Sequence, residues 1–362
     1  MKKNFYLMTA LCAIMLSACS ADTEPTPTTE KDRTAKLEIS LVGTTTRATG
    51  TLPGDTGAEN QLNTIAVGVF NSDNSTNTIT EFDSNQLTAK SAVINCTPST
   101  GCTIVVVANA PSGHFAGVTT LSNFNAKTVN LSQTNSGGVQ VNTNLPMSAQ
   151  QMGVDLTVAG PNTVTLALSR LVSRISIADI KTAFDPIGQY KDATFTATDI
   201  FLYNAKSTST VNPATPVTTD LISGETAGNE YLKNALSDVL IPAGGYTTPY
   251  WFYTFANDDT SPTKLVIKGM FDADGAGGGA AVPVYYPVVV NKNQVGTTIT
   301  DNDGNVLGQT GTITRNRAYK IGVTIKGKGV ASPADDIVPA ELTINVSVKD
   351  WDLVINQNVV FD

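Results

Sequence analysis

The sequence has a single histidine, His114, among its 362 residues. It follows Pro111-Ser-Gly113 in a turn-like segment, so a hydrolase triad or a multi-histidine metal site has little to build on. No G-x-x-x-x-G-K-[ST] phosphate loop occurs, and the glycine-rich residues 275–279 read as a hairpin loop without a following helix. We therefore predict no enzyme, no resident metal and no cofactor.

Charged residues are also scarce, at 15% of the chain, and acidic ones predominate, with a net charge of −8. A nucleic-acid surface needs clustered Lys and Arg, so nucleic-acid binding is excluded. The acidic stretch Asp301-Asn-Asp303-Gly-Asn305 begins like a calcium loop. However, Val306 stands where the sharp turn needs Gly, and Thr312 stands where the bidentate Glu belongs.

A long hydrophobic run is found only at the start of the chain. Lys2 and Lys3 precede an apolar run over residues 5–16, which ends in Leu16-Ser-Ala-Cys19. The run is about a dozen residues, whereas a membrane-spanning helix needs about 20, so residues 1–19 are predicted to be a signal peptide. Cleavage directly before Cys19 would leave a thiol that carries a diacylglyceryl group, as in a bacterial lipoprotein. The alternative is an ordinary secretory signal that happens to contain Cys12 and Cys19.

The chain has four cysteines. Cys12 would be removed with the signal peptide and Cys19 would carry the lipid, so only Cys96 and Cys102 remain as thiols in the folded protein. They flank Thr-Pro-Ser-Thr-Gly, a turn-like segment, and the exported compartment is oxidising. We predict a local disulfide that closes a hairpin. Two reduced thiols on neighbouring strands are the alternative, and a zinc site is disfavoured because no histidine lies nearby.

What the chain does contain is Thr, Val, Asn, Gly and Ser, with 29 Gly and 17 Pro. Long amphipathic helical patterns are scarce, so the composition predicts a mostly β protein. Its length suggests two domains, because domains commonly run about 100 to 200 residues. One short helix is expected at residues 121–129. The main expected strands are residues 65–70, 103–109, 164–168, 193–203, 250–255, 264–270, 284–290, 319–325 and 342–351.

The segment between the signal and the first domain has two parts. Residues 20–35 are rich in Ser, Thr, Pro and acidic residues and read as a flexible tether. Alternation then places Leu37, Ile39 and Leu41 on one face of a strand. A small, polar, Gly-rich stretch carrying Arg47 follows, and such loops are preferred sites of proteolytic nicking. An exposed arginine without a processing role is the alternative.

The C-terminal residues repeat this strand pattern. Period-2 geometry puts four apolar residues on one face with Gln357 between them, namely Leu353, Ile355, Val359 and Phe361. One groove could therefore accept either segment, and loss of the first would open an edge for β-augmentation by the second. The alternative is that residues 353–361 are simply the last strand of their own domain.

Several motifs occur together in a characteristic order. Besides the Cys19 box and the loop Arg47, these are Val106-Val-Ala-Asn-Ala-Pro111, Leu145-Pro-Met-Ser148, Leu168-Ser-Arg-Leu-Val-Ser-Arg-Ile175, Arg315-Asn-Arg-Ala-Tyr319 and Val348-Lys-Asp-Trp-Asp-Leu-Val354. In these features the chain resembles the fimbrillins of the Bacteroidales, the lipoprotein-derived pilins of type V pili. The resemblance spans nearly the whole chain.

The resemblance implies two tandem transthyretin-like β-sandwich domains, at residues 48–170 and 171–352. It also implies that a trypsin-like protease removes a propeptide, residues 20–47, so that the mature chain begins at Ala48. Residues 353–362 would then be a donor-strand tail. The expected partners are identical subunits in a homopolymer, anchor and tip subunits, and receptors on host or bacterial surfaces.

The expected route is an outer-membrane lipoprotein precursor whose mature form lies in a cell-surface fimbria that supports adhesion and biofilm formation. Two other functions stay open. One is an anchor or tip subunit of a fimbria. The other is a monomeric surface glycan-binding lipoprotein, which would need exposed aromatic platforms. The chain has only two tryptophans, and Trp351 sits at a strand end that suits core packing.

Overall fold

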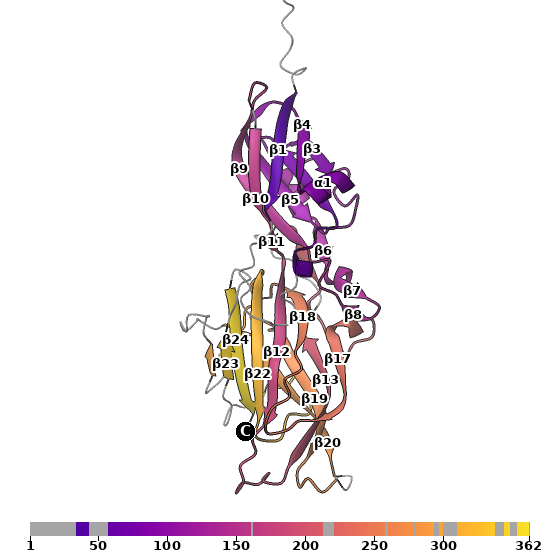
Figure 1. Ribbon diagram of the computed structural model, residues 1–362, viewed down its shortest axis with the longest axis vertical. Helices are drawn as coiled ribbons and strands as arrows, with labels where there is room; N and C mark the ends of the chain where they lie inside the picture. Colours follow the sequence, from indigo (N-terminus) through magenta and orange to yellow (C-terminus); the bar gives the residue numbers. More distant parts are fainter. Residues whose placement is uncertain are drawn as a thin grey trace, which may run out of the picture.

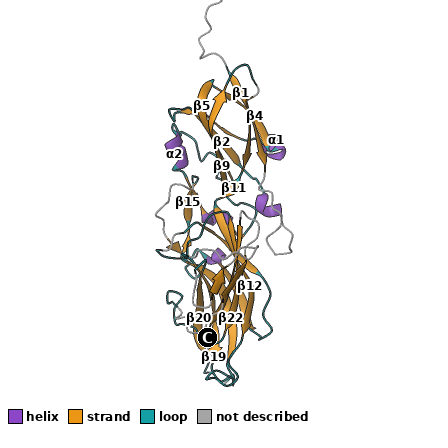
Figure 2. Cartoon of the chain, turned by 90° about the vertical axis from the view of Figure 1, so that its left-hand side faces the viewer, coloured by secondary structure: helices purple, strands orange, loops and turns teal. Residues whose placement is uncertain are grey.

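A computed structural model describes residues 34–42, 57–160, 162–212, 221–257, 260–277, 280–292, 297–299, 310–336, 344–347 and 353–361. The described chain is built almost entirely of strands, with short helices at the periphery (Figure 2). Two pairs of sheets follow one another along the long axis of the molecule (Figure 1). This confirms the prediction of a mostly β protein.

The first unit contains a three-stranded and a five-stranded sheet. The three-stranded sheet has the order β10 (Asn162–Ala167), β1 (Ala35–Val42), β4 (Ser91–Cys96). The five-stranded sheet has the order β11 (Ser169–Arg170), β9 (Met147–Leu156), β5 (Ser99–Ala108), β2 (Ile65–Phe70), β3 (Thr76–Glu81). Strands of the small sheet alternate between buried and exposed residues, which is the signature of a sheet with one face on the core. By contrast, all six residues of β2 are buried.

The second unit contains a six-stranded and a four-stranded sheet. The larger has the order β18 (Tyr250–Phe255), β12 (Val172–Thr182), β22 (Arg317–Ile325), β24 (Leu353–Phe361), β23 (Ile344–Ser347), β21 (Thr297–Ile299). The smaller has the order β17 (Lys233–Leu240), β13 (Thr194–Tyr203), β19 (Lys264–Asp272), β20 (Val282–Val289). The chain passes from the sheets of the first unit to those of the second between β11 and β12.

Small elements join and decorate the two units. Strand β15 (Thr208–Thr210), which follows β13, pairs with β6 (Thr128–Asn130) of the first unit. The remaining strand pairs are β7 (Asn135–Ser136) with β8 (Val139–Gln140), and β14 (Ala205–Lys206) with β16 (Leu221–Ile222). The helices are η2 (Gly57–Asn60), α1 (Ser84–Ala89), α2 (Leu121–Asn125), η3 (Leu131–Thr134) and η4 (Glu230–Leu232).

The helix expected over residues 121–129 is real but shorter. It begins after Thr120, whose side-chain oxygen accepts a hydrogen bond from the Asn123 backbone N–H, as an N-cap does. It ends at Asn125, and residues 128–130 form β6 instead. Within the described residues, no helix is long and apolar enough to cross a membrane.

Candidate functional site

Strand β1 is the middle strand of the three-stranded sheet. It pairs in parallel with β10 from Leu37 to Val42 and antiparallel with β4 from Ala35 to Ser40. Strands β10 and β4 are not neighbours in the sheet order, so β1 alone connects them. A strand that pairs on both sides satisfies its own backbone and that of two neighbours.

The inward face of β1 fills the core of the first unit. Leu37 and Ile39 are completely buried and Leu41 is nearly so, whereas Glu38 and Val42 on the other face are exposed. Burying each large apolar side chain contributes about 1.5 to 3 kcal/mol. The three residues that the sequence placed on one face of a strand therefore hold β1 in a deep apolar slot.

The connection between β1 and the rest of the chain is the region that carries the candidate cleavage site. Strand β1 ends at Val42, and the described chain resumes at η2, which begins at Gly57. Arg47 and Ala48 fall between them, outside the described residues. Cleavage there leaves β1 joined to the body by hydrogen bonds and apolar contacts alone. Its release would expose two strand edges and an empty slot lined by β4, β10 and the core.

The chain after this connection is fixed at the junction of the two units by a buried cluster of polar groups. The Glu59 carboxylate in η2 accepts hydrogen bonds from Arg174 in β12, with both oxygens 3.1 Å from Nη1. The Tyr253 hydroxyl in β18 donates to the same carboxylate at 2.5 Å. All three side chains are buried, with at most 3% of their surface exposed. Burial, together with the nearby Glu59 charge, holds the pKa of Tyr253 well above its usual value, so the phenol stays a donor.

Arg170 extends the same cluster. Its side chain is fully buried and donates from Nε to the Glu59 carbonyl at 3.3 Å and from Nη2 to the Asn60 side chain. A third bond, from Nη1, reaches Asn316 beside β22 at 3.5 Å. Both arginines thus tie η2 to the second unit. After cleavage, the new N-terminal segment would therefore stay bound to the second unit through Glu59 and Asn60, about ten residues after the candidate cut.

Removing the carboxylate of this cluster should destabilise the fold strongly. Glu59→Ala removes the carboxylate that pairs with the buried Arg174 guanidinium, and breaking a buried pair in this way typically costs about 3 to 5 kcal/mol. Urea unfolding should therefore show a large drop in midpoint. The matched control is Asp192→Ala, which breaks an exposed pair with Lys191 at 3.4 Å and should change stability by less than about 1 kcal/mol. Equal midpoints for the two variants would contradict a stabilising role for the cluster.

The candidate donor tail forms β24, which lies within the sheet of its own second unit. It pairs in parallel with β22, with Leu353 beside Arg317 and Phe361 beside Ile325. On its other side, in the residues that the structure describes, it pairs with β23 at Gln357 opposite Val346. Ile355 and Val359 take the register positions of Tyr319 and Val323, whose side chains are buried.

Cys96 and Cys102 are free thiols in the structure, which departs from the predicted disulfide. The sequence suggested a hairpin, but Cys96 ends β4 of the three-stranded sheet and Cys102 lies in β5 of the five-stranded sheet. The Pro- and Gly-containing segment therefore crosses between two sheets. Burial, and secondarily the neighbouring Cys102, raises the pKa of Cys96 to about 11, so little of the reactive thiolate is present at neutral pH.

We expect both thiols to resist alkylation in the native protein and to react once it is unfolded. Burial raises the pKa of Cys102 as well, so neither thiol has the exposed, electropositive setting of a reactive cysteine. The measurement is the mass after iodoacetamide treatment of native and of urea-unfolded protein without reductant. Addition at neither position in the unfolded sample would instead show that the two sulfurs are bonded.

Other residues singled out from the sequence have ordinary surroundings or cannot be placed. His114 packs edge-on against Phe115, with ring centroids 5.1 Å apart, and burial lowers its pKa. Residues 301–309, which include the calcium-like stretch, and Cys19 lie outside the described residues. In the part of the chain that is described, no group of three or more His, Cys, Asp or Glu side chains is arranged to hold a metal ion.

Comparison with known proteins points to one family. A sequence model described as "Major fimbrial subunit protein (FimA)" matches residues 35–217. The chain is 28% identical over 411 residues to "Major fimbrium subunit FimA type-2" of Porphyromonas gingivalis, covering 98% of both chains. It is 26% identical over 413 residues to the FimA type-3 subunit of that organism, covering all of both chains. A solved structure of a fimbrilin (FimA) from P. gingivalis W83 has the same fold, with a TM-score of 0.64, 19% identity, and coverage of 91% of this chain and 98% of the other.

Proposed function

The chain belongs to the FimA family of major fimbrial subunit proteins, which are structural and not enzymatic, and from this premise we propose that it is a shaft subunit polymerised by strand exchange. In this proposal residues 48–170 and 171–352 form two tandem transthyretin-like β-sandwiches. Cys19 anchors the precursor to the outer membrane, and a trypsin-like protease then cuts after Arg47. The tail of the next subunit, residues 353–362, fills the slot that β1 vacates.

The observation that carries the proposal is the position of β1 between β10 and β4 in the three-stranded sheet. A strand that completes the core of the first unit is joined to the chain through a stretch whose only Lys or Arg is Arg47. Its loss leaves β4 and β10 with unpaired edges, which is the state that β-augmentation repairs. The buried Glu59 cluster keeps the new N-terminal segment attached to the body after the cut.

The pairing partners of the two positions can be compared. Within the described residues, β24 forms a ladder with β22 on one side and pairs with β23 on the other, at Gln357 opposite Val346. In the slot of β1, a strand has a ladder on both sides, with β10 and β4. Four apolar side chains with the same period-2 spacing as Leu37, Ile39 and Leu41 would enter the core. At about 1.5 to 3 kcal/mol each, they offset a large part of the cost of association.

N-terminal sequencing of protein sheared from the cells tests this function. We expect a start at Ala48, because the polymerised form has lost residues 20–47. A blocked, lipidated start at Cys19 would instead indicate an anchor subunit or a resident surface lipoprotein. Intact mass measurement of the same sample is the control, since a lipid-bearing chain is heavier by its acyl groups.

A further inference from the structure

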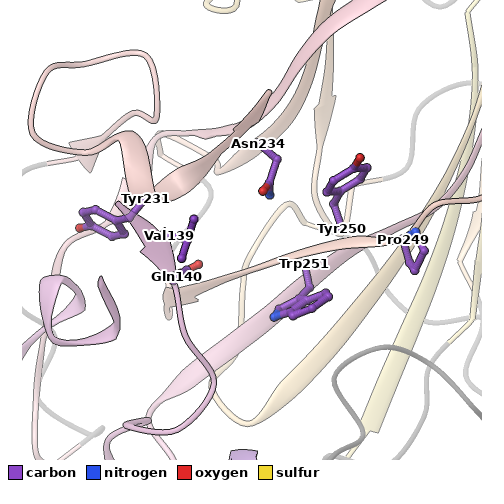
Figure 3. A pocket seen from close by; sticks show the side chains of 7 residues that line it. All are labelled: Val139, Gln140, Tyr231, Asn234, Pro249, Tyr250 and Trp251. Atoms are coloured by element: carbon purple, nitrogen blue, oxygen red, sulfur yellow. The ribbon is translucent and has the colours of Figure 1, made fainter. Parts of the chain in front are cut away.

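An open cavity of about 300 Å³ lies where the first unit meets the edges of both sheets of the second. One wall comes from β8, and the others come from η4, β17 and the start of β18 (Figure 3). Besides Val139, three aromatic residues, one proline and two amide side chains line it: Tyr231, Tyr250, Trp251, Pro249, Gln140 and Asn234. Its volume is at the lower end for ligand sites, which suits a ligand of one or two rings.

The lining combines flat apolar surfaces with neutral hydrogen-bonding groups. In Figure 3 the side chains of Tyr250 and Trp251, which are consecutive in β18, lie on opposite sides of that strand, with Asn234 on the side of Tyr250. The Trp251 Nε1–H is buried and finds no acceptor among the described residues. The Tyr250 hydroxyl is 3.1 Å from that of Tyr246, and burial raises the pKa of Tyr250 to about 12, so the phenol is neutral. Among the described residues, none that lines the cavity is charged.

An extended peptide does not fit this edge of the sheet. Strand β18 is the outermost strand, yet the Gln140 amide already occupies the backbone of Tyr253, accepting from its N–H at 2.7 Å and donating to its carbonyl at 3.0 Å. Pro249 has no N–H to offer on the other side of Trp251. Strand addition would therefore be limited to the backbone of Trp251, which favours a compact ligand.

We propose that this cavity binds a neutral pyranose ring, such as the terminal hexose of a surface glycan. A pyranose has an apolar face of C–H groups that stacks on an indole or phenol ring, and a rim of hydroxyls that pair with an amide such as Asn234. The Gln140 amide is already bonded to Tyr253 and Thr134. The absence of charged groups from the lining selects against acidic sugars, because a carboxylate would be desolvated without a partner. The site does not depend on polymerisation, although a fibre would repeat it and so raise avidity.

Tryptophan fluorescence tests the proposal directly because the chain has only two tryptophans. In a Trp351→Phe background, Trp251 is the only indole and reports on the cavity. Titration with glucose, galactose, mannose and N-acetylglucosamine should give a saturable change for at least one sugar. A millimolar dissociation constant is expected for a ligand of about a dozen non-hydrogen atoms. N-Acetylneuraminic acid, which is acidic, should bind at least about tenfold more weakly.

Variants locate the binding. Asn234→Ala should weaken sugar binding by about tenfold or more. Trp251→Leu removes the fluorescent reporter, so it is tested by saturation-transfer NMR in a chain with no other substitution. This variant should abolish the signal of the sugar. Ile187→Ser, which changes a side chain that is 91% exposed and is not among the lining residues, should leave sugar binding unchanged. Circular dichroism checks that each variant is folded. The proposal is overturned if no neutral sugar gives saturable binding, if Asn234→Ala binds as well as the parent, or if the acidic sugar or an extended peptide binds more tightly.

Discussion

Deleting residues 353–362 is expected to leave a processed, soluble subunit that cannot extend a fibre. The deletion removes β24, which borders β22 and β23, and so takes away the only strand proposed to enter the slot of a neighbour. The candidate cut after Arg47 is near the other end of the sequence and should still occur. Electron microscopy of the assembled material and N-terminal sequencing of the subunit measure the two effects separately. Long fibres from the deleted chain would rule out the donor assignment.

A pair of double substitutions separates loss of the strand from loss of its buried face. Ile355→Asp with Val359→Asp puts two charges on the face proposed to enter the slot, where burial of an unpaired charge is costly. Val354→Asp with Asn358→Asp adds the same charges to the other face, because side chains alternate along a strand. The first pair should shorten or abolish fibres and the second should do much less. Equal impairment by both pairs would mean that the face was assigned wrongly.

These substitutions also act on the sheet of the second unit, where β24 pairs with β22 in the isolated subunit. Ile355 and Val359 stand beside Tyr319 and Val323 in β22, so the first pair also perturbs the isolated subunit. Circular dichroism and urea unfolding of each monomer are therefore needed before fibre lengths are compared. Addition of a tail-deleted subunit, whose own slot is open after processing, gives a second check. It should cap growing fibres that carry a normal tail, because it accepts a donor strand but offers none.

Local sequence pattern was sufficient to predict the elements whose residues alternate. Leu37, Ile39 and Leu41 were assigned to one strand face because period-2 spacing is a short-range property, and the structure buries all three. The expected strands at residues 65–70 and 250–255 have the bounds of β2 and β18. The pattern of the tail is equally local, but it does not decide between home pairing and exchange. In the structure the tail is the neighbour of β22.

Features that depend on which strands meet were not accessible in this way. Cys96 and Cys102 looked like the two ends of a hairpin, yet β4 and β5 belong to different sheets, and sequence spacing does not reveal sheet membership. Glu59 and Arg174 are 115 residues apart, and buried charges of this kind resemble surface charges in a sequence. The cavity beside Trp251 was missed for the same reason, because its lining comes from β8, η4, β17 and β18.

Arg47→Ala should yield an unprocessed monomer in which β1 stays paired between β10 and β4. Leu37, Ile39 and Leu41 remain tethered to the slot that they fill, and an intramolecular strand has a high effective concentration relative to a donor tail from another subunit. Mass spectrometry should find residues 20–47 still attached, and electron microscopy should find no fibres. Lys36→Ala is the control: it removes a basic residue of β1 away from the candidate loop, so processing and assembly should proceed.

A second substitution in the same chain distinguishes an occupied slot from a missing cut as the cause of failure. Ile39 is fully buried on the inward face of β1, so Ile39→Asp places an unpaired charge in the core and weakens the seat of that strand. Combined with Arg47→Ala, it should restore some fibre growth, since the slot becomes available to a donor tail although the connection is intact. If occupancy of the slot is what blocks assembly, the double variant assembles better than Arg47→Ala alone. If the double variant is folded and stays monomeric, release of β1 by cleavage has a role that emptying the slot does not replace.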